Sequence, residues 1–406
     1  MNVLWVKADY PLPLDSGSKK RTFNLLKKAG PDLTVTYIGF VPDQNYIAAP
    51  GLAGVVEHEH TIYRPRERKE GPAFYLRVLS NLGSPQPYFA KRNTSRQIQR
   101  LMRDQLRDHS FDLLVCDGVD MSINVDFALP IPKVLLSHGI ETTLWQQRYE
   151  TSHGYLRRAY FNYETKRMAA FERLMCNRFD MVLTVSQLDK DRLESEFNVR
   201  VPIEVIETGV DCVYFSRGQD IPTVPHKLVF TGSQDLLSNI DGLLWFAAEV
   251  YPAVKKEYPD VTLDIVGPDP ASEIIALGKK DESIKVTGWV EDVRPYLAAA
   301  EAFIVPLRAP GGTRVKIYEA MCLKTPVVST TYGAEGLSLL PNINLLIADT
   351  AKDFASSIIE LFGNKEKRDS LVDNGWRMVN EKYDWTSMSE RMVRVFHQLL
   401  DAVKKT

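Results

Sequence analysis

Short apolar runs alternate with longer segments of helical periodicity along almost the whole chain. Such runs are typical of strands buried on both faces, while the segments between them repeat apolar residues every three or four positions. Because parallel strands need a crossover, usually a helix, the alternation predicts an α/β fold with parallel doubly wound sheets. The predicted strands are 3–6, 34–40, 55–62, 113–116, 134–136 and 181–185 in the first half of the chain, then 228–230, 261–266, 285–286, 302–305, 327–329 and 345–347.

Several segments depart from this alternation. Residues 63–93 mix basic and aromatic side chains with prolines, which is typical of a loop-rich surface. Aromatic faces stack on sugars or lie at a lipid boundary and arginines pair with phosphates, although an irregular insertion packed on its own aromatics has the same composition. Residues 144–179 predict a long helical stretch with a break at 152–154, and the last helix is expected over 385–403. Residues 212–226 are polar and contain prolines, as an interdomain linker does.

Length and charge narrow the class of protein. At 406 residues the chain is too long for one ordinary core and fits two domains of about 200 residues each. The net charge of −2 argues against nucleic acid as the main partner, because neutralising phosphates requires a strongly basic domain. A small excess of Lys and Arg in residues 1–200 favours an anionic acceptor or a membrane surface, or is simply a solvated face.

Cysteine use and hydropathy indicate the compartment. The four cysteines are far apart and show neither metal-ligand spacing nor disulfide density, which favours a reducing cytosol. The chain enters a strand at once, and no apolar run approaches the ~20 residues of a membrane span. We therefore expect a soluble or peripheral protein.

The stretch 306–337 carries the strongest chemical signal. It reads PLRAPGGTRVKIYEAMCLKTPVVSTTYGAEGL and combines a glycine turn, a basic helix start and a buried strand. Gly311 and Gly312 allow the backbone to turn tightly, and Thr313 is the expected N-cap. Apolar residues then recur at helical spacing as far as Met321, so a helix is expected to begin near residue 314.

This helix start is predicted to be an anion site. Its free N–H groups and the positive end of its dipole favour anions, and Arg314 and Lys316 add formal charge at the same place. Diphosphate is the natural ligand. Glu319, in the second turn, is near enough to accept hydrogen bonds from the hydroxyls of an attached ribose. A surface helix with mixed charges would show the same local pattern.

The wider sequence resembles one family. Residues 306–337 are similar to the donor-binding segment of the retaining glycosyltransferases of family 4, which have the GT-B architecture of two Rossmann-like domains. In that family two Glu residues stand eight positions apart. Glu319 matches the second, which holds the donor ribose, and Gly311 stands at the first. Branches of the family that read GGTR-x-K-x-x-EAM share this departure, which bears on the identity of the donor sugar.

The resemblance also implies a domain organisation. We expect an N-terminal acceptor-binding domain at 1–211 and a nucleotide-sugar-binding domain at 227–384, with the donor cleft between them. The segment 203–211 resembles the end of the first domain in the family. The last helix, within 385–406, is expected to cross back to the first domain.

Three predicted site residues of the first domain follow its strands. The first loop contains one glycine, Gly17, where a dinucleotide fingerprint needs three, which disfavours a nicotinamide enzyme. In the resembling family this loop contacts the sugar and the diphosphate, which assigns Gly17 and Ser18 to the donor. His138 follows strand 134–136 at the edge of the sheet where ligands bind. A histidine there is more often structural, but the resemblance implies a hydrogen bond to the sugar or to the leaving diphosphate.

Glu141 has two interpretations. Its carboxylate would orient the acceptor, or it would cap the helix that follows. The capping role is the favoured one.

In the second domain, Gly232 and Ser233 follow the first strand, where many family members place an Arg and a Lys for the diphosphate. Neither residue type occurs between Gly232 and Trp245. Arg314 and Lys316 are therefore the expected replacements, because burying two phosphate charges without a cation would be costly. The family contacts the base near residues 290–291. The expected catalytic residues are His138, Arg314 and Lys316, and the expected donor contacts are Gly17, Ser18, Gly232, Ser233, Val290, Glu291, Gly312, Thr313, Arg314, Val315, Lys316 and Glu319.

The implied function is transfer of a sugar from a nucleoside diphosphate sugar to a saccharide or lipid-linked saccharide, with retention of configuration, in polysaccharide or glycan biosynthesis. Asp189-Lys190-Asp191 matches a D-x-D metal motif but falls in a helix opening, where acidic residues suit the dipole, so neither a metal nor a cofactor is expected. A sugar-nucleotide epimerase or hydrolase on the same fold, and a catalytically silent partner of another transferase, remain as alternatives. We expect a cytoplasmic enzyme with a peripheral contact at the inner face of the membrane.

Overall fold

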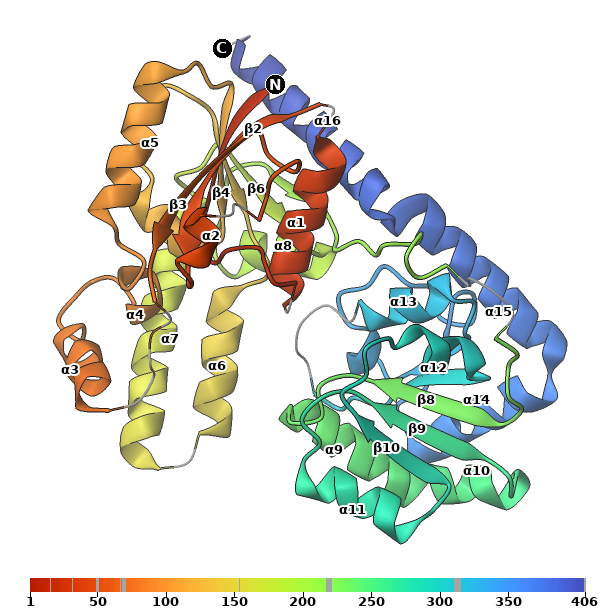
Figure 1. Cartoon of the computed structure of the whole chain (residues 1–406). Helices are drawn as coiled ribbons and strands as arrows, with labels where there is room; N and C mark the ends of the chain where they lie inside the picture. The colour runs from red at the N-terminus through yellow and green to blue at the C-terminus, as the bar shows by residue number, and fades with distance from the viewer. Residues whose placement is uncertain are drawn as a thin grey trace. The chain divides into compact units, whose positions relative to one another are not determined.

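The computed structural model describes residues 1–14, 16–30, 32–48, 51–65, 67, 71–152, 154–216, 221–309 and 315–404. The chain forms two units (Figure 1). The first comprises Met1–Glu207 and Met388–Thr406, and the second comprises Thr208–Ser387. Each unit contains a parallel sheet with helices packed on it, which confirms the predicted α/β class with two doubly wound sheets.

The sheet of the first unit has seven parallel strands in the order β3-β2-β1-β4-β5-β6-β7. Its central strands β4 and β5 are buried at every position, as expected of strands covered on both faces. These two strands contain the predicted strands 113–116 and 134–136. The strands are β1 (Asn2–Lys7), β2 (Thr34–Val41), β3 (His58–Tyr63), β4 (Leu113–Asp117), β5 (Lys133–Leu136), β6 (Met181–Thr184) and β7 (Ile203–Val205).

The helices of the first unit begin where capping groups are available. Ser16 caps α1 (Gly17–Ala29), because its side chain accepts a hydrogen bond from the N–H of Lys19. α6 (Glu141–Thr151) and α7 (Tyr155–Cys176) pack against each other and are separated at the predicted break. α16 (Trp385–Lys404) returns to this unit, where Ser389 Oγ donates a 3.0 Å hydrogen bond to the carbonyl of Leu25. The other helices are α2 (Asn45–Ala48), α3 (Pro72–Ser80), α4 (Tyr88–Lys91), α5 (Arg96–Asp108), the short 3₁₀ helix η1 (Val119–Asn124) and α8 (Gln187–Ser195).

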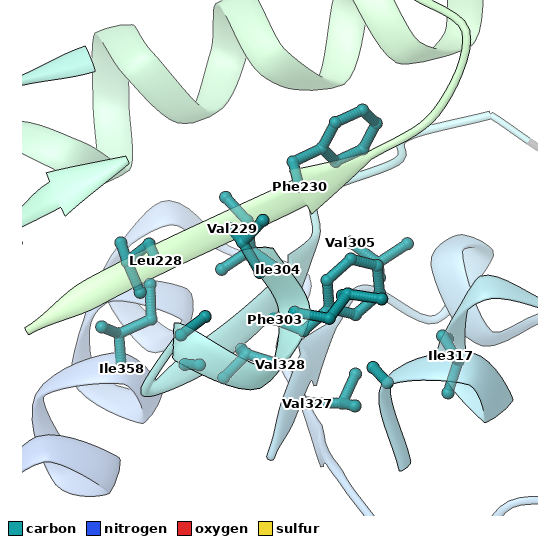
Figure 2. Packing of buried hydrophobic residues seen from close by; sticks show 14 of the residues in the cluster. Leu228, Val229, Phe230, Phe303, Ile304, Val305, Ile317, Val327, Val328 and Ile358 are labelled. Atoms are coloured by element: carbon teal, nitrogen blue, oxygen red, sulfur yellow. The ribbon is translucent and has the colours of Figure 1, made fainter. Parts of the chain in front are cut away.

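The sheet of the second unit has six parallel strands in the order β10-β9-β8-β11-β12-β13. Figure 2 shows part of its core, where Phe303 of β11 lies beside aliphatic side chains of the neighbouring strands and Phe230 of β8 projects away from them. Ile317 of helix α13 (Lys316–Cys322) and Ile358 of helix α14 (Ala351–Gly363) add to this core. The strands are β8 (Lys227–Thr231), β9 (Thr262–Val266), β10 (Ile284–Gly288), β11 (Ala302–Val305), β12 (Val327–Ser329) and β13 (Leu346–Ile347).

The helices of the second unit follow its strands in the expected alternation. Two of them end in π-helical turns, η2 (Phe246–Val250) after α9 and η4 (Val379–Tyr383) after α15. The helices are α9 (Leu237–Trp245), α10 (Tyr251–Glu257), α11 (Ser272–Lys280), α12 (Arg294–Ala299), α13 (Lys316–Cys322), the 3₁₀ turn η3 (Tyr332–Ala334), α14 (Ala351–Gly363) and α15 (Lys365–Met378).

One prediction about elements was incomplete and another was wrong. The segment 63–93, expected to be a loop-rich surface, also contains the helices α3 and α4. α3 forms because Pro72 occupies its start, where a missing N–H costs nothing, and no further Gly or Pro interrupts it. The strand predicted from residue 55 begins at His58, because the N–H groups of Val55 and Val56 turn back to the carbonyl of Leu52. Of the helices that the structure describes, none is long and apolar enough to cross a membrane.

The first unit ends at Glu207 and not at the predicted residue 211. The N–H of Val210 donates a 2.8 Å hydrogen bond to the carbonyl of Tyr383, and the N–H of Trp385 donates a 3.2 Å bond to the carbonyl of Val210. A Cβ on Gly209 would also lie 2.8 Å from the Trp385 ring. These contacts attach residues 208–211 to the second unit.

Candidate functional site

The predicted anion site lies partly outside the described residues. α13 begins at Lys316, and Val315 precedes it with helical backbone angles, so the helix that is described starts two residues after the predicted position. The predicted turn and N-cap fall on residues 310–314, outside the described residues. The predicted roles therefore stay predictions for Gly311, Gly312, Thr313 and Arg314.

Lys316 lies at the carboxyl end of β8, where the sequence predicts the diphosphate. Its Nζ donates a 2.9 Å hydrogen bond to the carbonyl of Thr231, the last residue of β8, and lies 4.0 Å from the centre of the Phe230 ring. Gly232 follows with a φ of 150°, and a Cβ on it would come within 3.4 Å of the Lys316 Nζ. The structure therefore brings together two of the residues expected to contact the donor.

The backbone at this point is held tightly. A Cβ on Gly267, which follows β9, would lie 2.0 Å from the carbonyl oxygen of Gly232, so only glycine fits there. The carbonyl of Ser233 accepts a 2.7 Å hydrogen bond from Asn239 Nδ2, and the Ser233 hydroxyl donates a 2.6 Å bond to Asp235. The positions of Gly232 and Ser233 are thus fixed by the ends of β8 and β9 and by α9.

The other predicted donor residues of the second unit lie on elements that meet this edge. Glu319 is half-buried on α13, three residues after Lys316, and so lies on the same side of the helix. Val290 is half-buried and Glu291 is exposed in the segment after β10. Because the carboxyl ends of parallel strands share one edge of a sheet, these side chains belong to the edge where such folds bind ligands.

A buried charged cluster lies at the carboxyl edge of the first sheet. Asp117 ends β4, Lys7 ends β1 and His138 follows β5. Asp117 Oδ1 lies 2.6 Å from Lys7 Nζ and 2.5 Å from His138 Nε2. Asp117 Oδ2 accepts hydrogen bonds from Trp5 Nε1 at 2.9 Å and from Thr22 Oγ1 at 2.7 Å. Burial alone would raise the pKa of Asp117, but Lys7 and His138 outweigh it and hold that pKa well below its usual value.

Both ring nitrogens of His138 face groups of the protein. Arg21 Nη1 lies 3.3 Å from Nδ1, and a guanidinium can only donate, so Nδ1 is the acceptor. The proton of the neutral ring is then on Nε2 and is donated to Asp117. Burial, together with Lys7, lowers the pKa of His138 to about 4, so the ring is neutral at pH 7. As the ring stands here, neither nitrogen is available for the predicted hydrogen bond to a sugar or a diphosphate.

A small cavity of about 90 Å³ opens beside this cluster. Two carboxyl groups on it have raised pKa values. Burial, with Asp9 nearby, raises the pKa of Asp120 to about 6. Burial, with Asp120 nearby, raises the pKa of Glu141 to about 8. The residues around the cavity are Lys7, Ala8, Asp9, Ser18, Phe89, Asp117, Gly118, Val119, Asp120, Ser137, His138, Gly139 and Glu141.

The predicted donor residues of α1 lie at or next to this cavity. Ser18 is part of its wall. Gly17 is the first residue of α1, and no described atom lies within 4 Å of the place where a Cβ would stand. A ligand can therefore approach the backbone at Gly17 closely.

The cap of α6 is Glu172, so the favoured interpretation of Glu141 was wrong. The carboxylate of Glu172, which comes from α7, accepts hydrogen bonds from the N–H of Glu141 at 2.9 Å and from the N–H of Thr142 at 3.1 Å. It also accepts a 2.7 Å bond from Thr142 Oγ1. Glu141 is left to face the cavity, where its carboxyl can meet a ligand.

The sequence interpretation missed several residues of this cluster, chiefly Lys7, Arg21 and Asp117. A signal was present, because Lys7 and Asp117 are charged residues that close otherwise apolar central strands. Arg21 gave no such signal. It is the last of three consecutive basic residues near the start of α1. Its side chain is nevertheless buried and donates hydrogen bonds to the carbonyls of Ser137 and Ile206 at 2.7 and 2.8 Å.

The D-x-D motif serves the start of α8. The Ser186 side chain accepts from the N–H of Asp189 and donates a 2.9 Å hydrogen bond to the Asp189 carboxylate, while Asp191 accepts from Gln187. Within the described residues, no group of three His, Cys, Asp or Glu side chains is arranged to hold a metal ion. Metal independence remains a prediction.

Two family models match successive parts of the chain. Residues 49–214 match the model described as Glycosyltransferase Family 4, and residues 225–364 match the model described as Glycosyl transferases group 1. Together the two matches cover well over half of the chain.

The chain belongs to the glycosyltransferases.

Solved structures support the same architecture. This glycosyltransferase superposes on a sucrose-phosphate synthase from Thermosynechococcus elongatus with a TM-score of 0.70 and 17% identity, over 99% of this chain and 100% of the other. It superposes on the Anabaena protein HepE, solved with UDP, with a TM-score of 0.67 and 16% identity, over 98% and 100% of the two chains. At these identities the likeness shows the fold, which is GT-B.

One curated relative is named for a cps region. The glycosyltransferase is 24% identical over 267 residues to an "Uncharacterized 44.6 kDa protein in cps region" of Klebsiella pneumoniae. The match covers 62% of this chain and 65% of that protein, which is slightly less than two thirds of the relative's length.

Proposed function

We propose that this glycosyltransferase moves a sugar from a nucleoside diphosphate sugar to a hydroxyl of a saccharide or lipid-linked saccharide, with retention of configuration. The observation that carries the donor half of the proposal is the Lys316 ammonium at the carboxyl end of β8, within 3.4 Å of the position of a Cβ on Gly232. A cation at this edge, close to backbone without a side chain, suits a diphosphate.

The donor diphosphate is the leaving group. As the bond from the anomeric carbon to the diphosphate oxygen breaks, its electron pair stays on the diphosphate, and the added negative charge is stabilised by Lys316 and, on the sequence prediction, by Arg314. The acceptor oxygen forms the new bond and its proton goes to the departing diphosphate. Glu319 holds the donor ribose. Uridine nucleotides are the first to test, since the Anabaena protein was also solved with UDP-glucose.

The cavity of the first unit is proposed to receive the acceptor. With pKa values of about 6 and about 8, Asp120 is mostly ionised and Glu141 mostly protonated at pH 7. The pair therefore offers an acceptor and a donor of hydrogen bonds, which suits sugar hydroxyls. In this scheme His138 acts as a positioning residue through Asp117 and Arg21.

We also propose a biosynthetic process, a reaction without a metal or other cofactor, and a compartment for the enzyme. We propose polysaccharide biosynthesis because the Klebsiella relative is named for a cps region. We propose that no metal or other cofactor takes part, because Lys316 and Arg314 supply the cationic charge, and that the enzyme works in the cytoplasm.

The donor assignment is tested by replacing Lys316 with Gln. We expect Lys316→Gln to lower turnover by about 10²-fold, because one charged contact to the developing diphosphate is lost. Turnover is measured as release of nucleoside diphosphate, and binding as the thermal shift given by UDP, GDP, ADP and TDP with and without EDTA. Lys279→Gln, on the exposed end of α11, is the matched control and should leave both unchanged.

Two outcomes would contradict the proposal. Turnover of Lys316→Gln within about twofold of the parent would remove Lys316 from the diphosphate site. A parent protein that no nucleotide stabilises would favour the catalytically silent alternative, while release of nucleoside diphosphate without any acceptor would favour a hydrolase.

A further inference from the structure

Helix α3 carries apolar side chains on two opposite faces. Phe74 and Val78 are half-buried, and the Phe74 ring packs against Tyr88 with 6.0 Å between ring centres. This face attaches the helix to the first unit. The second face consists of Pro72, Tyr75, Leu76 and Leu79, at the spacing by which a helix normally buries an apolar stripe.

This second face is exposed. Tyr75 is 60% exposed, Leu76 66% and Leu79 60%, and none of the residues of α3 is buried. Single exposed apolar residues are normal on a protein surface, but a whole stripe of them at helical spacing marks an interaction site.

Exposed apolar side chains also stand at the start of α7. Tyr155 is 87% exposed and Leu156 83%. The two elements are tied together, because Tyr163 of α7 donates a 2.7 Å hydrogen bond to the carbonyl of Leu82, just after α3. Figure 1 shows α3 and the end of the α6–α7 pair lying away from the sheet of the first unit.

Basic side chains accompany these apolar residues. Arg157 and Arg158 directly follow Leu156, are exposed, and lie over the rings of Phe161 and Tyr149. Among the described residues, neither has a carboxylate within ion-pair distance. Arg77 of α3 is different, because Glu67 neutralises it at 3.1 Å. The surface as a whole is therefore apolar with a positive excess at the start of α7.

We propose that this surface docks on an anionic lipid bilayer. It consists of Tyr75, Leu76 and Leu79 of α3 and Tyr155, Leu156, Arg157 and Arg158 of α7, and we name it the α3–α7 surface. Exposed Leu and Tyr side chains with flanking arginines are the combination that lies at a bilayer interface, where the apolar groups enter and the arginines meet lipid phosphates. The proposal goes beyond the transfer reaction and does not depend on the donor assignment, because lipid binding requires no nucleotide.

The test is sedimentation of the full chain with vesicles, without nucleotide. We expect binding to vesicles of phosphatidylcholine with phosphatidylglycerol, weaker binding to phosphatidylcholine alone, and a decrease with added salt. Arg157→Gln with Arg158→Gln should weaken binding to the anionic vesicles by about 30-fold, since each basic residue near an anionic surface contributes about fivefold. Leu76→Asn with Leu79→Asn should weaken binding to both kinds of vesicle by at least about tenfold.

The matched control is Leu340→Asn, an exposed leucine of the second unit, which should change nothing. All substituted residues are exposed, and thermal unfolding of each variant checks that the fold is kept. Binding that is unchanged in both double variants, or the absence of binding to anionic vesicles, would overturn the proposal. A dimer in light scattering that Leu76→Asn with Leu79→Asn abolishes would also overturn it, because the surface would then be an interface between two copies of the chain.

Discussion

Asp117 is the residue on which the charged cluster of the first unit depends. It accepts hydrogen bonds from Trp5 and Thr22 and is the counter-charge for Lys7, which is itself only 3% exposed. It also fixes the tautomer of His138. A buried pair of this kind adds little net stability over apolar residues of the same size, but removing one partner leaves a buried charge uncompensated.

We therefore expect Asp117→Asn to lower the free energy of unfolding by about 3–5 kcal/mol, measured by urea denaturation at pH 7. Asp117→Leu combined with Lys7→Met removes both charges and should recover most of the loss. If the single variant were as stable as the parent, Lys7 would have to lose its charge or reach water in the folded state, and the assigned cluster would be wrong.

At the scale of elements, the sequence predicted the strands well and the surface helices less well. Apolar runs placed β11 and β12 at their observed bounds, because strands buried on both faces admit few polar residues. α3 was missed because its apolar stripe faces outward, where composition resembles that of a loop with aromatic residues. The cap of α6 was assigned to Glu141 because Glu172 lies 31 residues further along the chain, and no local pattern reports such a pairing.

The difference between local sequence patterns and long-range contacts also separates the predicted residues of the site from the missed ones. Lys316 could be proposed from the sequence because its helix start has a local motif, and its role in binding the diphosphate stays a prediction. The roles of Lys7, Arg21 and Asp117 depend on contacts between strands and helices far apart in sequence, which only the folded chain brings together.

The start of α6 gives a prediction at this scale. Glu172→Ala removes the acceptor for the N–H groups of Glu141 and Thr142, and we expect it to lower the free energy of unfolding by about 1–2 kcal/mol, as the loss of a helix cap does. Glu172→Gln keeps one oxygen acceptor and should lose less in the same urea denaturation. An unchanged stability of Glu172→Ala would mean that α6 is held by packing alone.

At the scale of the whole molecule, the two units differ in how the chain builds them. The second unit is one continuous segment, Thr208–Ser387, whereas the first combines Met1–Glu207 with the residues from Met388 onward. The second unit has its own sheet and its own buried core.

We therefore expect residues 208–387 to fold when produced alone, with a cooperative thermal transition followed by circular dichroism. A chain that stops at residue 387 should in contrast show a lower transition temperature for its first unit, because the bonds from Ser389 to Leu25 and from Arg391 to Glu207 are lost. Failure of the isolated segment 208–387 to show a cooperative transition would contradict its independence.

The return of α16 to the first unit has a consequence for how the protein is made. A ribosome releases the chain from its N-terminus at about 5–20 residues per second, and domains generally fold as they emerge. Here the first unit to emerge is the last to be completed, because the helix that contacts α1 through Ser389 is synthesised after the entire second unit. During that interval the side of α1 that α16 will cover remains exposed to solvent in the nascent chain.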